Sequence, residues 1–523
     1  IFLDRRYMES QNLLDFLRRL EKLGLKANLS LRPSMPMDHE RQWPEIKPII
    51  EYYRLRENDT IFAYDLTWEP MWGKHEDRKR WDSLWEKWVI EQYGSIENAE
   101  KDWGFPIPRD ANGKVTNPSS EQIERDGEWR RMVSAYRRFL DILVYKEYSA
   151  ARRRVKSIDP NHLVSFRMAN AGDPTMRWEG RLAYDWPYLA GAVDILEPEA
   201  YGRIGDWERV KAGWFEFEYA RACAPHLPMI WAEMGCNIWV SAQNKPVPET
   251  LAYQAQFYKD FYKMMIYSGA DGIFFWWYPG GFRVGENSDF GIINPDGSDR
   301  PVTKIIREYG PRFVKGPDAK KIDYWIEIDR DKRAEGIVGI YDEVQEEFWT
   351  AIANGHAPGL KLAGTGLKST NCPRVAVGNT QWTGNNPSKY LDGVFDLVEV
   401  QDETGSWIEV KNRETVEVSP TTPIKVRLTL TNLGMAQWIS PNKEEGTGTI
   451  FVKVAGVNET FRYPLPSNVD HLESIILEGI NIPTQTSHIV NEITLSLEAD
   501  GIGRFGEVFR LKLATKYTKE TSN

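Results

Sequence analysis

The stretch IFAYDLTWEPMWG, residues 61–73, decides the architecture that we expect for this chain. Its first half is a run of β-branched and aromatic side chains, which is typical of a buried strand. The run breaks at Pro70, which has no N–H to donate to a neighbouring strand. Glu69 therefore follows the carboxyl end of a strand, between Trp68 and Pro70 and close to Trp72. Apolar and aromatic surroundings favour the protonated form of a carboxyl group, which suits a proton donor.

A second stretch, PMIWAEMGCN at residues 228–237, has the same design. It reads as an apolar strand that ends on Glu233. Two glutamates at the ends of two strands are the pair that glycoside hydrolysis needs, one as acid/base and the other as nucleophile or base. Retention of anomeric configuration requires the two carboxyl groups about 5–5.5 Å apart, whereas inversion requires about 6.5–9.5 Å. Glu69 and Glu233 are far apart in the sequence, so only the fold can bring them together.

Strand and helix patterns alternate on both sides of these stretches. We expect strands at 1–4, 26–31, 61–66, 163–167, 193–197, 228–232 and 271–277, with helical patterns between them. Such alternation predicts parallel pairing with right-handed crossovers. The pattern predicts an α/β fold, a (β/α)8 barrel (TIM barrel) whose first strand is missing, because the chain opens on Ile1 in what reads as a strand end. Catalytic groups of such barrels lie at the carboxyl ends of the strands. A doubly wound open sheet is the alternative fold, although no G-x-G-x-x-G opens a helix after any strand.

The remaining sequence predicts further domains. We expect a catalytic barrel over 1–315, a small α/β connector over 316–379, an immunoglobulin-like β-sandwich over 380–517 and a tail over 518–523. The sandwich is predicted from alternating apolar and polar residues separated by Gly, Pro and Asn turns. We interpret it as a support for the barrel or a surface for homo-oligomer contacts rather than as a sugar-binding domain.

Within the barrel range, residues 74–125 form a long excursion. Trp81, Trp85 and Trp88 fall on one face of a predicted helix there. We interpret this face as packing on the body of the protein rather than as a sugar site.

Composition excludes several classes of function. The net charge of −10, without a basic stripe, argues against nucleic-acid binding. Three cysteines without metal-type spacing and seven histidines without an H-E-x-x-H pair predict no metal site, and no cofactor is implied. No apolar run reaches the length of a membrane span. The 21 tryptophans fit sugar stacking or a large core equally well.

The strand ends carry a family resemblance. The strand ending in Trp68-Glu69-Pro70, the strand ending in Glu233 and the late strand ending in Trp276 resemble those of clan A glycoside hydrolases. The segments WEKWVIEQYGSIENAEKDWGF (85–105) and DFGIINPDGSDRP (289–301) are similar to segments of the family 42 β-galactosidases. This resemblance covers residues 1–315 and implies a retaining enzyme on a (β/α)8 barrel, with the acid/base after strand four and the nucleophile after strand seven.

By this resemblance, Glu69 is the acid/base and Glu233 the nucleophile. Tyr201 is expected to hydrogen-bond Glu233, and Trp276 to form the floor of the subsite for the reacting sugar. One departure from the clan concerns Trp68, which occupies the place of an asparagine that contacts the sugar 2-hydroxyl group. The resemblance therefore supports the type of reaction better than the identity of the sugar.

Other charged residues stand at the same strand ends. Glu197 and Glu199 flank the end of the strand at 193–197, and Arg32 and Arg167 end two further strands. Each either lines the cleft or forms a structural ion pair at the barrel mouth. We expect Arg32, Arg167 and Glu199 to contribute to substrate binding.

Two functions remain in competition. The leading hypothesis is a retaining β-glycosidase that acts on an oligo- or polysaccharide, with transglycosylation as a variant that uses the same two carboxylates. The alternative is a non-catalytic carbohydrate-binding or surface-assembly protein on a glycosidase scaffold. A carbohydrate substrate favours a secreted or periplasmic location over a cytoplasmic one, although no signal peptide is visible in the sequence.

Overall fold

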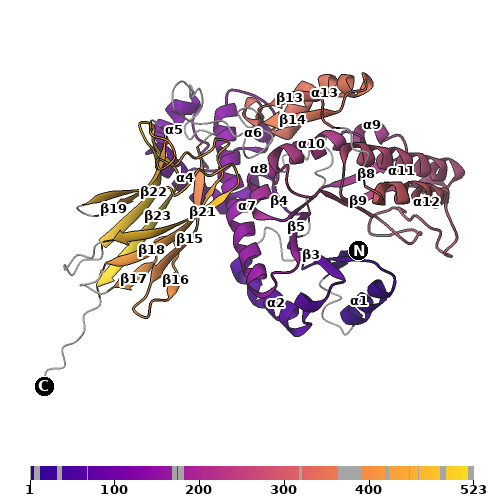
Figure 1. Cartoon of the computed structure of the whole chain (residues 1–523). Helices are drawn as coiled ribbons and strands as arrows, with labels where there is room; N and C mark the ends of the chain where they lie inside the picture. Colours follow the sequence, from indigo (N-terminus) through magenta and orange to yellow (C-terminus); the bar gives the residue numbers. More distant parts are fainter. Residues whose placement is uncertain are drawn as a thin grey trace. The chain divides into compact units, whose positions relative to one another are not determined.

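The computed structural model describes residues 2–4, 12–31, 38–67, 69–167, 174, 182–316, 321–362, 391–418, 423–446, 448–456, 459–482 and 491–515. The chain divides into two compact units (Figure 1). Unit 1 comprises Ile1–Arg80 and Asn117–Leu362, and unit 2 comprises Trp81–Thr116 and Ala363–Asn523.

Unit 1 is built on parallel strands that follow one another in sequence order. They are β1 (Phe2–Asp4), β2 (Ala27–Ser30), β3 (Ile61–Asp65), β5 (Leu163–Arg167), β7 (Ile195–Glu197), β8 (Glu199–Arg203), β9 (Ile230–Asn237) and β12 (Gly272–Phe275). Two sheets result, β1-β2-β3-β5-β7 and β12-β9-β8. Only Pro198 separates β7 from β8, and Leu196 pairs in parallel with Met229, which joins the two sheets. This sequential parallel order is that of a (β/α)8 barrel, and it confirms the predicted fold class.

Helices alternate with these strands, as the sequence pattern predicts. They are α1 (Asn12–Lys22), α2 (His39–Tyr52), α3 (His75–Arg78), α6 (Ser120–Glu124), α7 (Arg130–Ile158), α8 (Trp186–Leu189), α9 (Trp207–Val210), α10 (Gly213–Cys223), α11 (Pro248–Ser268) and α12 (Pro301–Val314). Short strand pairs are formed by β4 (Met71–Gly73) with β6 (Leu182–Ala183) and by β10 (Trp239–Val240) with β11 (Lys245–Pro246). Among the described helices, none is long and apolar enough to cross a membrane.

The start of the predicted connector belongs to unit 1. There β13 (Tyr324–Ile328), α13 (Ile337–Ala353) and β14 (Pro358–Leu362) form a parallel β-α-β motif. Arg330, which follows β13, is buried and pairs with Asp141 and Asp185 of the barrel. These ion pairs fasten the motif to α7 and to the start of α8. Residues 363–379 of the predicted connector lie outside the described part of the chain.

Unit 2 contains a β-sandwich and two helices from the excursion after β3. The strands are β15 (Gly393–Gln401), β16 (Trp407–Glu409), β17 (Thr415–Val418), β18 (Ile424–Asn432), β19 (Ile450–Ala455), β20 (Thr460–Pro464), β21 (Ser474–Ile482), β22 (Asn491–Ala499) and β23 (Gly503–Thr515). They form the sheets β16-β15-β18-β21 and β17-β23-β22-β19-β20. Their alternating inward side chains make one apolar core around Trp438.

The helices of this excursion are α4 (Asp82–Tyr93) and α5 (Ile96–Trp103). The indole of Trp85 stacks on those of Trp88 and Trp103, at 5.5 and 5.9 Å between ring centroids. Glu91 accepts a hydrogen bond of 2.7 Å from Arg510 on β23. Residues 81–116 therefore belong to the compact unit of the sandwich, which differs from the continuous range 1–315 that the sequence led us to expect. An apolar helix face predicts that the face is buried, but it does not identify the domain against which the helix packs.

Candidate active site

The register of the parallel strands places acidic and basic side chains opposite one another. Glu199 on β8 is the direct partner of Glu233 on β9, and Arg167 on β5 is the partner of Glu197 on β7. Registered partners on neighbouring strands point to the same face of a sheet, with the strands about 4.8 Å apart. The strand pairing therefore gives two pairs of charged residues, and contacts of Arg167 with Glu199 and Glu233 bring the pairs together.

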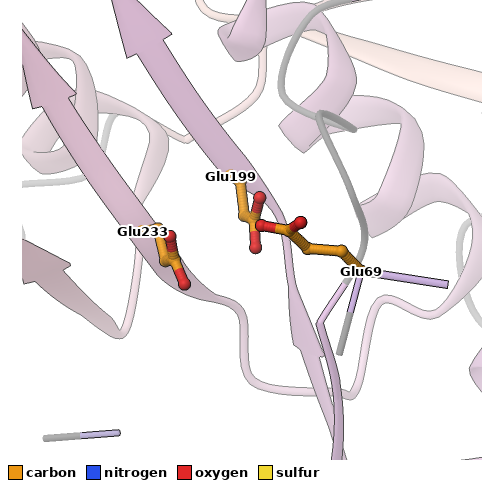
Figure 2. A group of neighbouring side chains, drawn as sticks. All are labelled: Glu69, Glu199 and Glu233. Atoms are coloured by element: carbon orange, nitrogen blue, oxygen red, sulfur yellow. The ribbon is translucent and has the colours of Figure 1, made fainter. Parts of the chain in front are cut away.

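Glu69 reaches the same place from the loop after β3. Its backbone has φ of +43°, in the left-handed region that non-glycine residues adopt mainly where surrounding structure enforces it. Figure 2 shows the Glu69 side chain extending toward Glu199, with Glu233 on the adjacent strand. Glu69, Glu199 and Glu233 each offer one carboxyl oxygen, and these three oxygens all lie within 4.8 Å of one another.

Two donors hold the carboxyl group of Glu233. Nη1 of Arg167 donates to Oε1 at 2.7 Å, and the hydroxyl group of Tyr201 donates to Oε2. Both hydrogen bonds favour the ionised form of Glu233. Burial nevertheless raises the pKa of Glu233 to about 8, and while Arg167 lowers it, Glu69 and Asp65 raise it further. Glu233 therefore ionises in the neutral to slightly alkaline range.

Arg167 is the cation of this cluster. Its guanidinium lies 3.4 Å from Asp65 and 3.7 Å from Glu199, in addition to its contact with Glu233. Burial by itself lowers the pKa of Arg167, but the charges of Asp65, Glu233 and Glu199 outweigh that effect and raise it. Arg167 therefore stays charged and shares its positive charge among several carboxyl groups.

Glu197, the last residue of β7, is a further fully buried carboxyl group. Nδ2 of Asn28 on β2 donates to Oε1 of Glu197 at 2.5 Å. Burial raises the pKa of Glu197 to about 8, and Asp65 adds to the shift, whereas Arg167 opposes it. The polar interior thus extends from the strand ends into the space between β2 and β7.

Trp276 follows β12 and lies close to the strand that carries Glu233. Its backbone N–H donates to the carbonyl of Met234 at 2.8 Å. A Cβ on Gly235 would lie 2.1 Å from the Trp276 carbonyl oxygen, so only glycine permits this approach. The guanidinium of Arg283 lies 4.6 Å from the ring centroid of Trp276 and 4.7 Å from that of Trp277.

The structure brings together five of the candidate residues, namely Glu69, Glu233, Tyr201, Arg167 and Glu199, and it places Trp276 beside the strand of Glu233. Trp68 and Arg32 lie outside the described residues. One expectation is wrong, because Glu233 does not end its strand. β9 continues to Asn237, since β8 runs alongside it and pairs residue by residue from Glu199 to Arg203.

Asp65 was missed by the sequence analysis. It is fully buried at the end of β3 and contacts Arg167. The sequence did contain an indication. Asp65 closes an apolar strand only four residues before Glu69, and burying an aspartate without a partner has a high free-energy cost. Its partner lies on another strand and is not recognisable from the sequence.

Within the described residues, one cluster of acidic side chains has oxygens close enough together to share a cation. It consists of Glu69, Glu199 and Glu233. The Arg167 guanidinium already supplies a positive charge to two of them, Glu199 and Glu233. The prediction that no metal ion binds here stays a prediction.

Comparisons with known proteins agree with this architecture. No family model matches the chain, and no curated protein matches it in sequence. The solved β-galactosidase from Rahnella sp. R3 is 12% identical, with a TM-score of 0.50, and the match covers 97% of this chain and 78% of that one. The β-galactosidase from Bacillus circulans sp. alkalophilus is 11% identical, also with a TM-score of 0.50, and the match covers 96% and 78%. At this level of identity the likeness concerns the fold, and this chain has the fold of the clan A β-galactosidases that its sequence resembles.

Proposed function

We propose that this protein is a retaining β-glycosidase in which Glu233 is the nucleophile and Glu69 the acid/base. The observation that supports the proposal is the close approach of the two residues, whose nearest carboxyl oxygens lie within 4.8 Å of each other. A close approach of this kind suits direct attack by one carboxylate on the anomeric carbon, as in a retaining enzyme.

In the first step, Glu69 donates its proton to the glycosidic oxygen as the bond from that oxygen to the anomeric carbon breaks. The carboxylate of Glu233 attacks the same carbon from the opposite face and forms a glycosyl ester. In the second step, Glu69 removes a proton from water, which attacks the anomeric carbon and releases Glu233. Two inversions give net retention.

Arg167 and Tyr201 stabilise and orient the proposed nucleophile, Glu233. Both donate to Glu233, one to each carboxyl oxygen. They stabilise the ionised form that attacks and fix the direction of its lone pairs. Since the pKa of Glu233 is about 8, hydrolysis is expected to increase as pH rises from 5 toward 8.

The nucleophile assignment is tested with aryl β-glycosides, starting with aryl β-galactosides because proteins of similar fold are β-galactosidases. Glu233→Gln is expected to lower kcat/KM by about 10⁴-fold or more, because no carboxylate remains to attack. Full retained activity would contradict the proposal. Wild-type protein that turns over no member of a broad aryl-glycoside panel would contradict it as well.

External azide separates the two roles. In Glu233→Ala, azide is expected to attack an activated β-glycoside directly and give the α-glycosyl azide. In Glu69→Ala, it is expected to attack the glycosyl-enzyme and give the β-glycosyl azide. Exchanged products would mean exchanged roles for the two glutamates.

One observation favours the second candidate, a non-catalytic carbohydrate-binding protein. Arg283 lies over the rings of both Trp276 and Trp277, where a sugar would stack. Calorimetric binding of an oligosaccharide without turnover of any aryl glycoside would support this function. The exported location also remains a proposal.

A further inference from the structure

Three buried carboxyl groups face one guanidinium in the described part of the site. Asp65, Glu199 and Glu233 are each at most 3% exposed, and Arg167 lies within 4 Å of all three. If all three were ionised, this group would carry a net charge of −2 in a medium that solvates charge poorly. Buried charges that are not balanced are costly, so the site lowers its free energy by keeping a proton on at least one of the three.

The three carboxyl groups differ in the hydrogen-bond donors that stabilise their ionised forms, and this difference indicates which group stays protonated. Glu233 accepts from Arg167 and Tyr201. Asp65 accepts from the backbone N–H of Thr67 at 3.3 Å, besides its contact with Arg167. By contrast, no N–H or O–H of the described residues donates to either carboxyl oxygen of Glu199. Its nearest cation contact is Nε of Arg167, 3.7 Å away, which is beyond hydrogen-bonding distance.

A neutral Glu199 has a clear acceptor. The carboxyl group of Glu69 faces it (Figure 2) and can accept a hydrogen bond once Glu199 carries a proton. We propose that Glu199 remains a neutral carboxylic acid through the reaction and is a positioning residue, which holds the Glu69 carboxyl group by donating a hydrogen bond to it. This inference rests on the proposed function for the role of Glu69, but the protonation of Glu199 can be measured without turnover.

The charged groups around Glu199 agree with this assignment. They are Glu69 from the loop after β3, Arg167 on β5 and Glu233 on β9. Burial raises the pKa of Glu199 well above its ordinary value, and Glu233 and Glu69 raise it further, whereas Arg167 lowers it. Because Glu199 lacks the two donors that serve Glu233, Glu233 ionises first when the pH rises.

The pH profile of Glu199→Gln tests the proposal. Glutamine is neutral and of the same shape, so replacing a neutral acid leaves the charge around Glu233 unchanged. The midpoint of the acid limb of kcat/KM is therefore expected to stay within about 0.3 pH units of wild type, while kcat falls about 10-fold because an amide is the weaker donor. A shift of the midpoint to lower pH by a unit or more would show that Glu199 is ionised in the wild type, and would overturn the proposal.

Asp65→Asn is the matched control. The charge of Asp65 raises the pKa of Glu233, so its removal is expected to move the acid limb to lower pH. The same assay thus shows that the loss of a real charge is detectable. If Glu199→Gln does not fold, Glu199→Met provides a second neutral side chain of similar length.

Infrared difference spectroscopy of substrate-free protein gives a readout that does not depend on hydrolysis. At pH 7, wild type minus Glu199→Gln is expected to show the carbonyl stretch of one protonated carboxyl group. A carboxylate band in its place would overturn the proposal. A wild-type protein that hydrolyses no glycoside would refute the proposed function, and the spectrum would still decide where the proton lies.

Discussion

The interior at the strand ends of unit 1 and the core of unit 2 are equally buried and have opposite chemistry. Around Trp438, the sandwich core is a cluster of hydrophobic side chains such as Leu428 and Leu495, each with no exposed surface. At the strand ends of unit 1, Arg167 and Glu197 are exposed by at most 2%. The first arrangement favours stability because apolar burial has no desolvation cost. The second arrangement lowers stability because buried charges are costly, but it supplies groups whose protonation can change.

The largest expected effect concerns the proton donor of unit 1. Glu69→Gln is expected to lower kcat/KM by about 10³- to 10⁴-fold for glycosides whose alcohol is a poor leaving group, because the departing oxygen then receives no proton. For aryl glycosides with an acidic phenol, this first step is expected to change little. Measurements with a series of aglycones of rising pKa test this. Equal losses for all aglycones would contradict the role of Glu69 as acid.

A matching change in unit 2 is expected to affect stability alone. Trp438→Ala removes a fully buried indole from the sandwich core and is expected to destabilise unit 2 by about 3–5 kcal/mol in urea unfolding. Hydrolysis under native conditions is expected to persist, because Trp438 contributes nothing to the charged cluster. Loss of activity in protein that remains folded would show that the two regions are coupled.

Glu197→Gln tests how much the burial of a carboxyl group in unit 1 costs in stability. The pKa of Glu197 is about 8 in the folded protein, above its ordinary value of 4.5, so the folded state holds a proton that the unfolded state releases. Stability due to this group is therefore present below pH 4.5 and falls as pH rises toward 8. The variant is expected to unfold with less pH dependence between pH 5 and 8, and to gain about 1–3 kcal/mol over wild type at pH 8. An unchanged slope in thermal unfolding would contradict this.

Tyr201→Phe is expected to have the smallest effect. It removes one donor from Glu233, which disfavours the ionised nucleophile. We expect kcat/KM to fall about 10-fold, equivalent to about 1.4 kcal/mol, and the acid limb of the pH profile to move to higher pH. A fall without any movement of the limb would indicate that Tyr201 contacts substrate and does not tune Glu233.

Local pattern was sufficient to predict seven of the eight parallel strands of unit 1, but not β8. The apolar run before Pro70 identified the strand that leads to Glu69, and PMIWAEMGCN identified the strand of Glu233. Alternation of strands and helices predicted parallel order, which the strand pairing of unit 1 confirms. These features follow from short-range periodicity and from backbone chemistry such as the missing N–H of proline.

The sequence by itself determined most of the strands of unit 1, that they run parallel, and that Glu69 follows one of them. Only the tertiary structure decided that Glu199 lies opposite Glu233, that Asp65 shares Arg167 with both, and that residues 81–116 join the sandwich unit. The physical reason is that these contacts depend on strand register and on partners distant in the chain. A one-residue change of register would turn each side chain to the other face while leaving the local pattern of residues the same.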